Sequence, residues 1–111
     1  MLRIYPVILE TLGAFRPLVA RVERRDADLA RQLRRASASV ALNTAEGMYS
    51  RGKNRLARYH TALGSMRETT ACIEVAVAMG HLGGIAPELA GLMHQVTGTL
   101  VRLVEGGAAA R

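Results

Sequence analysis

Residues 32–47 read QLRRASASVALNTAEG, and this stretch says more about the architecture than any other part of the chain. Two adjacent arginines lead into a run of small residues, and an asparagine, a glutamate and a glycine close it. The polar residues recur every three or four positions, which is the spacing of one side of an α-helix. This polar line could bind a ligand, form a nucleic-acid surface, or hold helices together.

The composition limits the classes of protein that the chain can belong to. Its 111 residues suit a single domain, and half of them are hydrophobic, with one Phe, three Tyr and no Trp. The core must therefore use aliphatic residues and alanine, which favour helices. The lone Cys72 excludes an internal disulfide and predicts a reducing compartment, the cytoplasm. No apolar run approaches the roughly 18 residues that a membrane span needs, so no membrane association is expected.

Apolar residues at helical spacing predict four helices. We place them at about residues 3–23, 27–49, 54–79 and 87–104, followed by a frayed tail over 105–111. Helices of similar length joined by short turns predict an all-α fold, an antiparallel up-down-up-down four-helix bundle in one domain.

Local signals support these boundaries. Pro17 lacks an N–H group, so we expect a kink or a break in the first helix. Asp26 and Asn54 are expected to act as N-caps of the second and third helices. Gly80 is expected to end the third helix, and Pro87 suits the first turn of the fourth.

The third helix has a long apolar seam that repeats about every seven residues and predicts near-parallel packing. The seam consists of Leu56, Tyr59, Leu63, Met66, Thr70, Ile73 and Val77. A second line of small residues, which includes Cys72, is expected to face inward as well. We therefore interpret Tyr59 and Cys72 as core residues rather than as a base-stacking ring and a nucleophile.

The charge of the chain is concentrated in its first part. Residues 1–67 hold 13 basic and 5 acidic residues, a balance of +8, whereas residues 68–111 hold 2 and 4, a balance of −2. Such a basic half predicts a polyanion partner, and the alternative is a solvated surface whose arginines pair with acids such as Glu23. Scarce aromatics favour phosphate contact over base stacking. The candidate nucleic-acid-binding residues are Arg31, Arg34, Arg35, Arg51, Lys53, Arg55 and Arg58.

The polar line on the second helix has two interpretations. In the functional one, Arg34, Arg35 and Glu46 hold a ligand. In the structural one, which we favour for its serine, asparagine and glutamate, it locks this helix against the third helix or a neighbouring subunit. An arginine would then bond to the asparagine or the glutamate and fix the register of the helices. The predicted structural polar stripe consists of Gln32, Ser39, Asn43 and Glu46.

The same pattern, followed by a basic turn and RYHTALGSMRET, resembles the four-helix-bundle family of 23S ribosomal RNA intervening-sequence proteins. This family includes the accessory variability proteins of diversity-generating retroelements. The resemblance covers about residues 26–80, and its signature falls on Leu29, Gln32, Arg34, Arg35, Ser39, Asn43, Ala45, Glu46, Gly47, Tyr59, Ala62, Gly64, Ser65 and Glu68. It implies a bundle that assembles into a ring, a pentamer being favoured, without catalytic activity. Accessory variability proteins are basic rings that bind nucleic acid and a partner reverse transcriptase.

The residues themselves give little support to an enzyme. Three histidines are scattered at 60, 81 and 94, without the Glu-x-x-His pairs of di-iron bundles, and neither a phosphate loop nor a serine-nucleophile motif is present. We therefore expect no catalytic residue, no cofactor and no metal. The sequence predicts a basic, ring-forming bundle that binds nucleic acid, RNA in preference to DNA. The alternative is an oligomeric scaffold that binds an acidic protein partner such as a reverse transcriptase.

Overall fold

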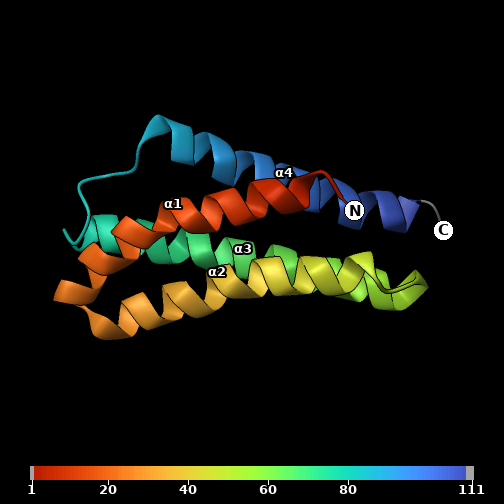
Figure 1. Ribbon diagram of the computed structural model, residues 1–111, viewed down its shortest axis with the longest axis horizontal. Coiled ribbons are helices and arrows are strands. Elements are labelled where there is room, and N and C mark those ends of the chain that lie inside the picture. The colour runs from red at the N-terminus through yellow and green to blue at the C-terminus, as the bar shows by residue number, and fades with distance from the viewer. Residues whose placement is uncertain (1, 110–111) are drawn as a thin grey trace.

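The chain folds into four antiparallel helices that lie side by side (Figure 1). The computed structural model describes residues 2–109, with side chains as far as residue 106. The helices are α1 (Ile4–Arg25), α2 (Ala27–Met48), α3 (Gly52–Ala78) and α4 (Pro87–Ala109). Each helix packs against two others, so α1 and α3 both lie between α2 and α4. The described residues contain no strand, and the predicted all-α four-helix bundle is confirmed.

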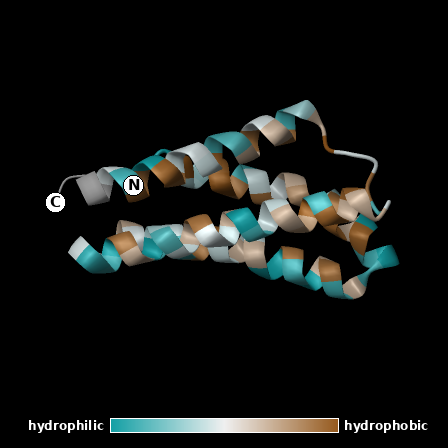
Figure 2. Ribbon diagram, turned by 180° about the vertical axis from the view of Figure 1, so that it is seen from behind, coloured by the Kyte–Doolittle hydropathy of each residue, from teal (hydrophilic) through white to brown (hydrophobic). Residues whose placement is uncertain are grey.

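Each helix buries its apolar side along the axis of the bundle. The most deeply buried large side chains come from all four helices and include Ile8, Leu33, Met66 and Leu100. Hydrophobic residues recur along every helix between hydrophilic ones (Figure 2). This core holds the bundle together, because packing of the apolar sides supplies most helical stability in proteins.

Three of the predicted local signals are confirmed. The Asp26 carboxylate accepts a hydrogen bond from the backbone N–H of Leu29 at 3.0 Å and caps α2. Gly80 follows the end of α3 with a φ of 79°, which favours glycine. Pro87 is the first residue of α4. The prediction that Asn54 caps α3 is wrong, because the helix already begins at Gly52.

Two other expectations need correction. α1 continues unbroken through Pro17, so of the expected kink or break, the break does not occur. Proline has no N–H group to donate to the carbonyl oxygen four residues earlier. Because Pro17 is exposed, that carbonyl group lies close to water. α4 continues to Ala109, past the expected end at Val104, so the predicted tail is wrong for residues 105–109. Residues 110 and 111 lie outside the described part of the chain.

The seam of α3 is confirmed except at its end. Tyr59 and Cys72 are buried, each 5% exposed, as expected of core residues. Val77, however, is 40% exposed. A seven-residue repeat drifts by about 20° per heptad on a straight helix, so the seam turns away from the core over three repeats. The second line takes over the packing there, and all four of its members are buried: Ala62, Thr69, Cys72 and Ala76.

Candidate nucleic-acid interface

A chain of hydrogen bonds joins α2 to α3 halfway along the bundle. The hydroxyl groups of Ser39 and Ser65 lie 2.7 Å apart. The Asn43 amide nitrogen donates to both the carbonyl and the hydroxyl oxygen of Ser39, at 3.0 Å each. The Asn43 amide oxygen in turn accepts from Nη1 of Arg58 on α3, at 3.3 Å. Two members of the predicted polar stripe therefore link the helices and also hold an arginine.

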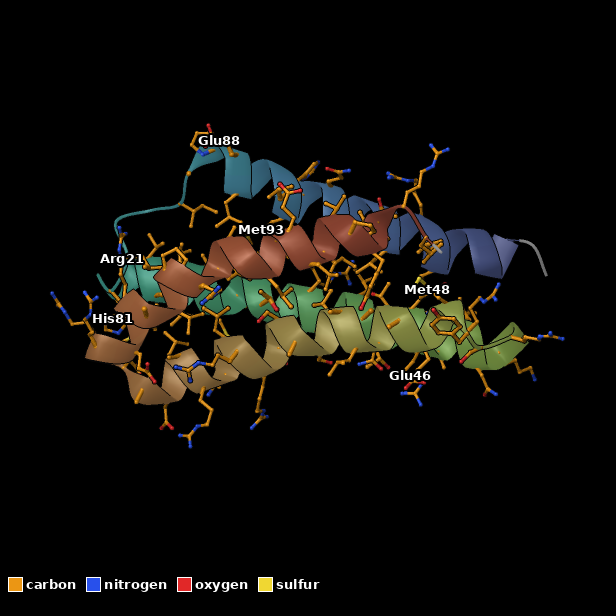
Figure 3. The ribbon with its side chains drawn as sticks, in the orientation of Figure 1. Arg21, Glu46, Met48, His81, Glu88 and Met93 are labelled. Carbon is orange, nitrogen blue, oxygen red and sulfur yellow. The ribbon has the colours of Figure 1, made fainter. Side chains whose placement is uncertain are left out.

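The other two members of the stripe are placed differently. Gln32 and Glu46 are exposed, and neither makes a side-chain hydrogen bond or ion pair within the described residues. Glu46 lies at the outer edge of the layer that α2 and α3 form (Figure 3). The expected arginine bonds to Asn43 and not to the glutamate. The interhelical network thus forms without Glu46.

Gly47, the last residue of the quoted stretch, has a steric role. A Cβ atom at this position would lie 2.4 Å from Cε1 of Tyr59, which is closer than such atoms can approach. Glycine therefore lets the buried Tyr59 ring pack against the end of α2. Burial raises the pKa of the Tyr59 phenol, and the positive charge of Arg55 lowers it in part.

All seven candidate cations are exposed, but they form two groups and not one surface. The first group, here called the α2 cluster, consists of Arg31, Arg34 and Arg35 near the start of α2. The second, the turn cluster, consists of Arg51, Lys53, Arg55 and Arg58 around the connection from α2 to α3. Sixteen residues separate Arg35 from Arg51, which corresponds to roughly 24 Å along a helix. Nitrogen-tipped side chains extend outward at both ends of α2 (Figure 3).

Acidic neighbours partly neutralise the α2 cluster. Arg31 forms an ion pair with Asp28 one turn earlier, and the Arg34 guanidinium lies 2.6 Å from the carboxylate of Glu23 on α1. Only Arg35 has no such partner among the described residues. The alternative of a solvated surface with acidic partners therefore describes two of these three arginines.

Among residues 2–109, no acidic side chain pairs with the turn cluster. Arg55 donates through Nε to the carbonyl oxygens of Gly47 at 3.2 Å and Ser50 at 2.9 Å, so it caps the end of α2 and leaves its two terminal NH₂ groups available. Arg51 and Lys53 make no ion pair within the described part of the chain. Residues 47–67 contain five cations and no carboxylate. The turn is thus the most uniformly positive part of the molecule.

Comparison with known proteins places the chain in a family. The family model described as "23S rRNA-intervening sequence protein" matches residues 18–100. The chain belongs to this family. A crystal structure of a protein of unknown function from the S23 ribosomal protein family of Bacteroides thetaiotaomicron has the same fold, with a TM-score of 0.76 at 15% identity, over 91% of this chain and 97% of that one. No curated protein matches. Neither match concerns the accessory variability proteins, so that part of the resemblance stays a prediction.

This member of the intervening-sequence family has further cations that the sequence analysis left out. Arg21, Arg24 and Arg25 are exposed at the end of α1, next to the turn into α2 and therefore near the α2 cluster. The run RVERRD, residues 21–26, carries this signal. Cations at the C-terminal end of a helix are also favourable because of the helix dipole.

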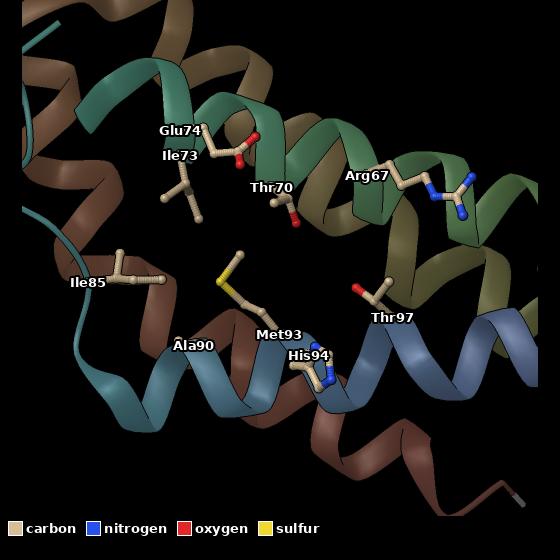
Figure 4. A pocket seen from close by; sticks show the side chains of 9 residues that line it. All are labelled: Arg67, Thr70, Ile73, Glu74, Ile85, Ala90, Met93, His94 and Thr97. Atoms are coloured by element: carbon tan, nitrogen blue, oxygen red, sulfur yellow. The ribbon is translucent and has the colours of Figure 1, made fainter. Parts of the chain in front are cut away.

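A hollow of about 560 Å³ lies between α3 and α4 (Figure 4). Arg67 of α3 lies at one end and Glu74 near the other, so this hollow has no net positive character.

The Nε2 atom of His81 lies 3.7 Å from the Asp26 carboxylate at the far end of the bundle. Across the described residues, no group of three or more His, Cys, Asp or Glu side chains could hold a metal ion. No helix among these residues is long and apolar enough to cross a membrane.

Proposed function

We propose that this protein is a non-enzymatic RNA-binding protein that holds structured RNA through the turn cluster, with the α2 cluster in a secondary role. One observation carries the proposal. The 21 residues from 47 to 67 contain no carboxylate and five exposed cations, four of them around the turn. Arginine suits phosphate because its planar guanidinium can donate two parallel hydrogen bonds.

The expected mode of binding is sequence-tolerant contact with phosphate groups. The single exposed aromatic side chain near the turn is Tyr49, since Tyr59 is buried. Base stacking can therefore contribute little. Affinity should fall linearly with salt on logarithmic axes, with a slope of about −0.7 to −0.9 for each phosphate contacted.

The experiment that tests this proposal is fluorescence anisotropy with a structured RNA across a salt series. The variant Arg51→Ala/Lys53→Ala should bind more weakly and lose about 1 to 2 from the slope. The matched control is Arg16→Ala/Arg102→Ala, which removes two exposed cations from α1 and α4. Equal effects of the two double variants would show that net charge alone governs binding, and would refute the assignment of the site.

Self-association forms a second part of the proposal. Leu42 and Tyr49, 66% and 86% exposed, lie seven residues apart on the outer side of α2. Ala38 and Ala45 alternate with them and would let another helix approach closely. We infer a homo-oligomer, with the pentameric ring of the resemblance favoured. Sedimentation should show that Leu42→Glu dissociates the assembly, whereas Met79→Glu, exposed at the end of α3, leaves it intact. A monomeric wild-type protein would refute this part.

The alternative function is an oligomeric scaffold for an acidic protein partner, such as a reverse transcriptase. Exposed Tyr and Leu beside arginines favour it, because Tyr and Arg are enriched at protein interfaces. Absence of RNA binding at low salt would favour this alternative. A cytoplasmic location, predicted from the lone Cys72, is compatible with both the RNA-binding function and the scaffold function.

A further inference from the structure

A polar hollow of about 420 Å³ lies on the outer side of the turn cluster. Its lining residues are Ser50, Asn54, Ala57, Arg58 and Thr61. The hollow between α1 and α2, in contrast, is lined in part by large apolar residues, namely Leu12, Phe15 and Val19. The lining of the polar hollow thus offers hydrogen-bonding groups in place of apolar contact.

One of these groups is a positively charged donor in a fixed position. Arg58 is tied through Asn43 to the interhelical hydrogen bonds of Ser39 and Ser65. This bond uses one of the five N–H groups of the guanidinium, and the others remain to bind a phosphate. A side chain that is already oriented loses less entropy on binding than a free one.

The two hydroxyl groups are turned into acceptors. The Ser50 hydroxyl donates its proton to the Glu46 carbonyl at 2.8 Å, and the Thr61 hydroxyl donates to the Ala57 carbonyl at 3.1 Å. Their oxygen lone pairs are left, and these accept hydrogen bonds. Phosphate oxygens are acceptors too, so they gain nothing from Ser50 and Thr61. These hydroxyl oxygens are complemented by a ligand that carries a hydrogen-bond donor as well as a phosphate.

The third polar side chain can serve either purpose. Asn54 makes no side-chain hydrogen bond within the described residues, and its amide both donates and accepts. The hollow therefore combines a cation, an amide and two acceptors. The RNA backbone carries the complementary groups: an anionic phosphate oxygen to match the cation and, a short distance away, a 2′-hydroxyl donor to match an acceptor. A volume of about 420 Å³ is far larger than one phosphate and falls in the range of small-ligand sites.

We propose that this hollow binds one ribose-phosphate unit of the RNA backbone, with the phosphate on Arg58 and the 2′-hydroxyl donating to the Thr61 hydroxyl oxygen. The protein would thereby distinguish RNA from DNA without reading the base sequence. This inference rests on the proposed RNA-binding function and deepens it, because it names the chemical group that the same surface recognises.

The test uses anisotropy at one salt concentration with three hairpins of identical sequence: RNA, DNA, and RNA with 2′-fluoro groups. The 2′-fluoro RNA keeps the A-form helix but lacks the hydroxyl donor, which separates recognition of the hydroxyl from recognition of shape. Wild-type protein should bind RNA about three- to ten-fold more tightly than 2′-fluoro RNA, the effect of one hydrogen bond. Thr61→Val should remove this difference and leave affinity for 2′-fluoro RNA unchanged.

The control variant is Thr97→Val on α4, which makes the same chemical change outside the polar hollow. It should keep the full preference for RNA. Equal affinity of wild-type protein for RNA and 2′-fluoro RNA would overturn this inference and leave the proposed function standing. A Thr61→Val variant that kept the preference would also overturn it. Failure to bind any of the three hairpins at low salt would overturn both.

Discussion

Replacing Gly47 by alanine should destabilise the bundle through one steric contact. The added Cβ would lie 2.4 Å from Cε1 and 2.8 Å from Cδ1 of Tyr59, so the ring must move by about 1 Å to restore ordinary contact. Overpacking of this kind costs about 1–3 kcal/mol. A hollow of about 480 Å³ beside Tyr59 gives the ring some room, so we expect the lower part of this range, about 1–2 kcal/mol.

The helical preference of alanine acts in the opposite direction. It is worth about 0.5–1 kcal/mol relative to glycine inside a helix, and less near the end of α2. Gly64→Ala measures this gain alone, because Gly64 lies within α3 and a Cβ there meets no atom within 4 Å. The difference in unfolding free energy between the two variants therefore reports the steric contact together with the smaller helical gain near the end of α2.

The assay is urea denaturation followed by far-UV circular dichroism, with a thermal scan beside it. Gly64→Ala should raise the melting temperature, and Gly47→Ala should lower the melting temperature by roughly 4–8 °C for each kcal/mol lost. Adding Tyr59→Leu to each glycine variant tests the partner, because the penalty of Gly47→Ala should then shrink. If Gly47→Ala stabilises the protein as much as Gly64→Ala does, the steric explanation of this glycine is wrong.

Further predictions concern the core, the caps and the thiol. Leu33→Ala should cost about 2–5 kcal/mol in urea denaturation, because this side chain has no exposed surface. Ser65→Ala should cost about 0.5–1.5 kcal/mol by the same assay, since it removes the 2.7 Å bond to α2. Asp26→Ala should lower the free energy of unfolding by about 1 kcal/mol, and Asp26→Asn, which keeps the acceptor, should lower it by much less. Burial and the nearby Glu68 raise the pKa of the Cys72 thiol, so iodoacetamide at about pH 8 should alkylate the folded protein at least tenfold more slowly than the urea-unfolded chain. Equal rates in the two states would contradict this.

The sequence predicted the fold because packing in a helical bundle follows a short-range repeat. The apolar lines, the Asp26 cap and the Gly80 end are all consequences of groups within a few residues of each other. The errors occurred where a different interaction outweighed the local signal. Asn54 is a good capping residue, but the positive φ of Gly52 turns the chain earlier, and the Asn54 N–H donates to the Arg51 carbonyl at 3.2 Å.

The candidate site could be predicted only in part. Which residues are cations, and that they are exposed, followed from the sequence. That they form two clusters did not, because it depends on where α2 ends and how α3 returns beside it. The ion pair between Arg34 and Glu23 joins two helices and arises from packing that no local pattern encodes.

The polar stripe separates into two roles for a reason of helix geometry. Each residue turns an α-helix by about 100°, so a step of four residues advances a side chain by about 40° and a step of three sets it back by about 60°. The step from Arg35 to Ser39 and the next to Asn43 both turn toward α3, and the step from Asn43 to Glu46 turns back toward water. The same spacing that joined these residues into one line thus also separates Glu46 from the two residues at the helix contact. An amide at position 43 suits this boundary, since it donates to Ser39 on its own helix while it accepts from Arg58 on the next. Ser39 and Asn43 therefore join α2 to α3 and also hold Arg58 of the turn cluster.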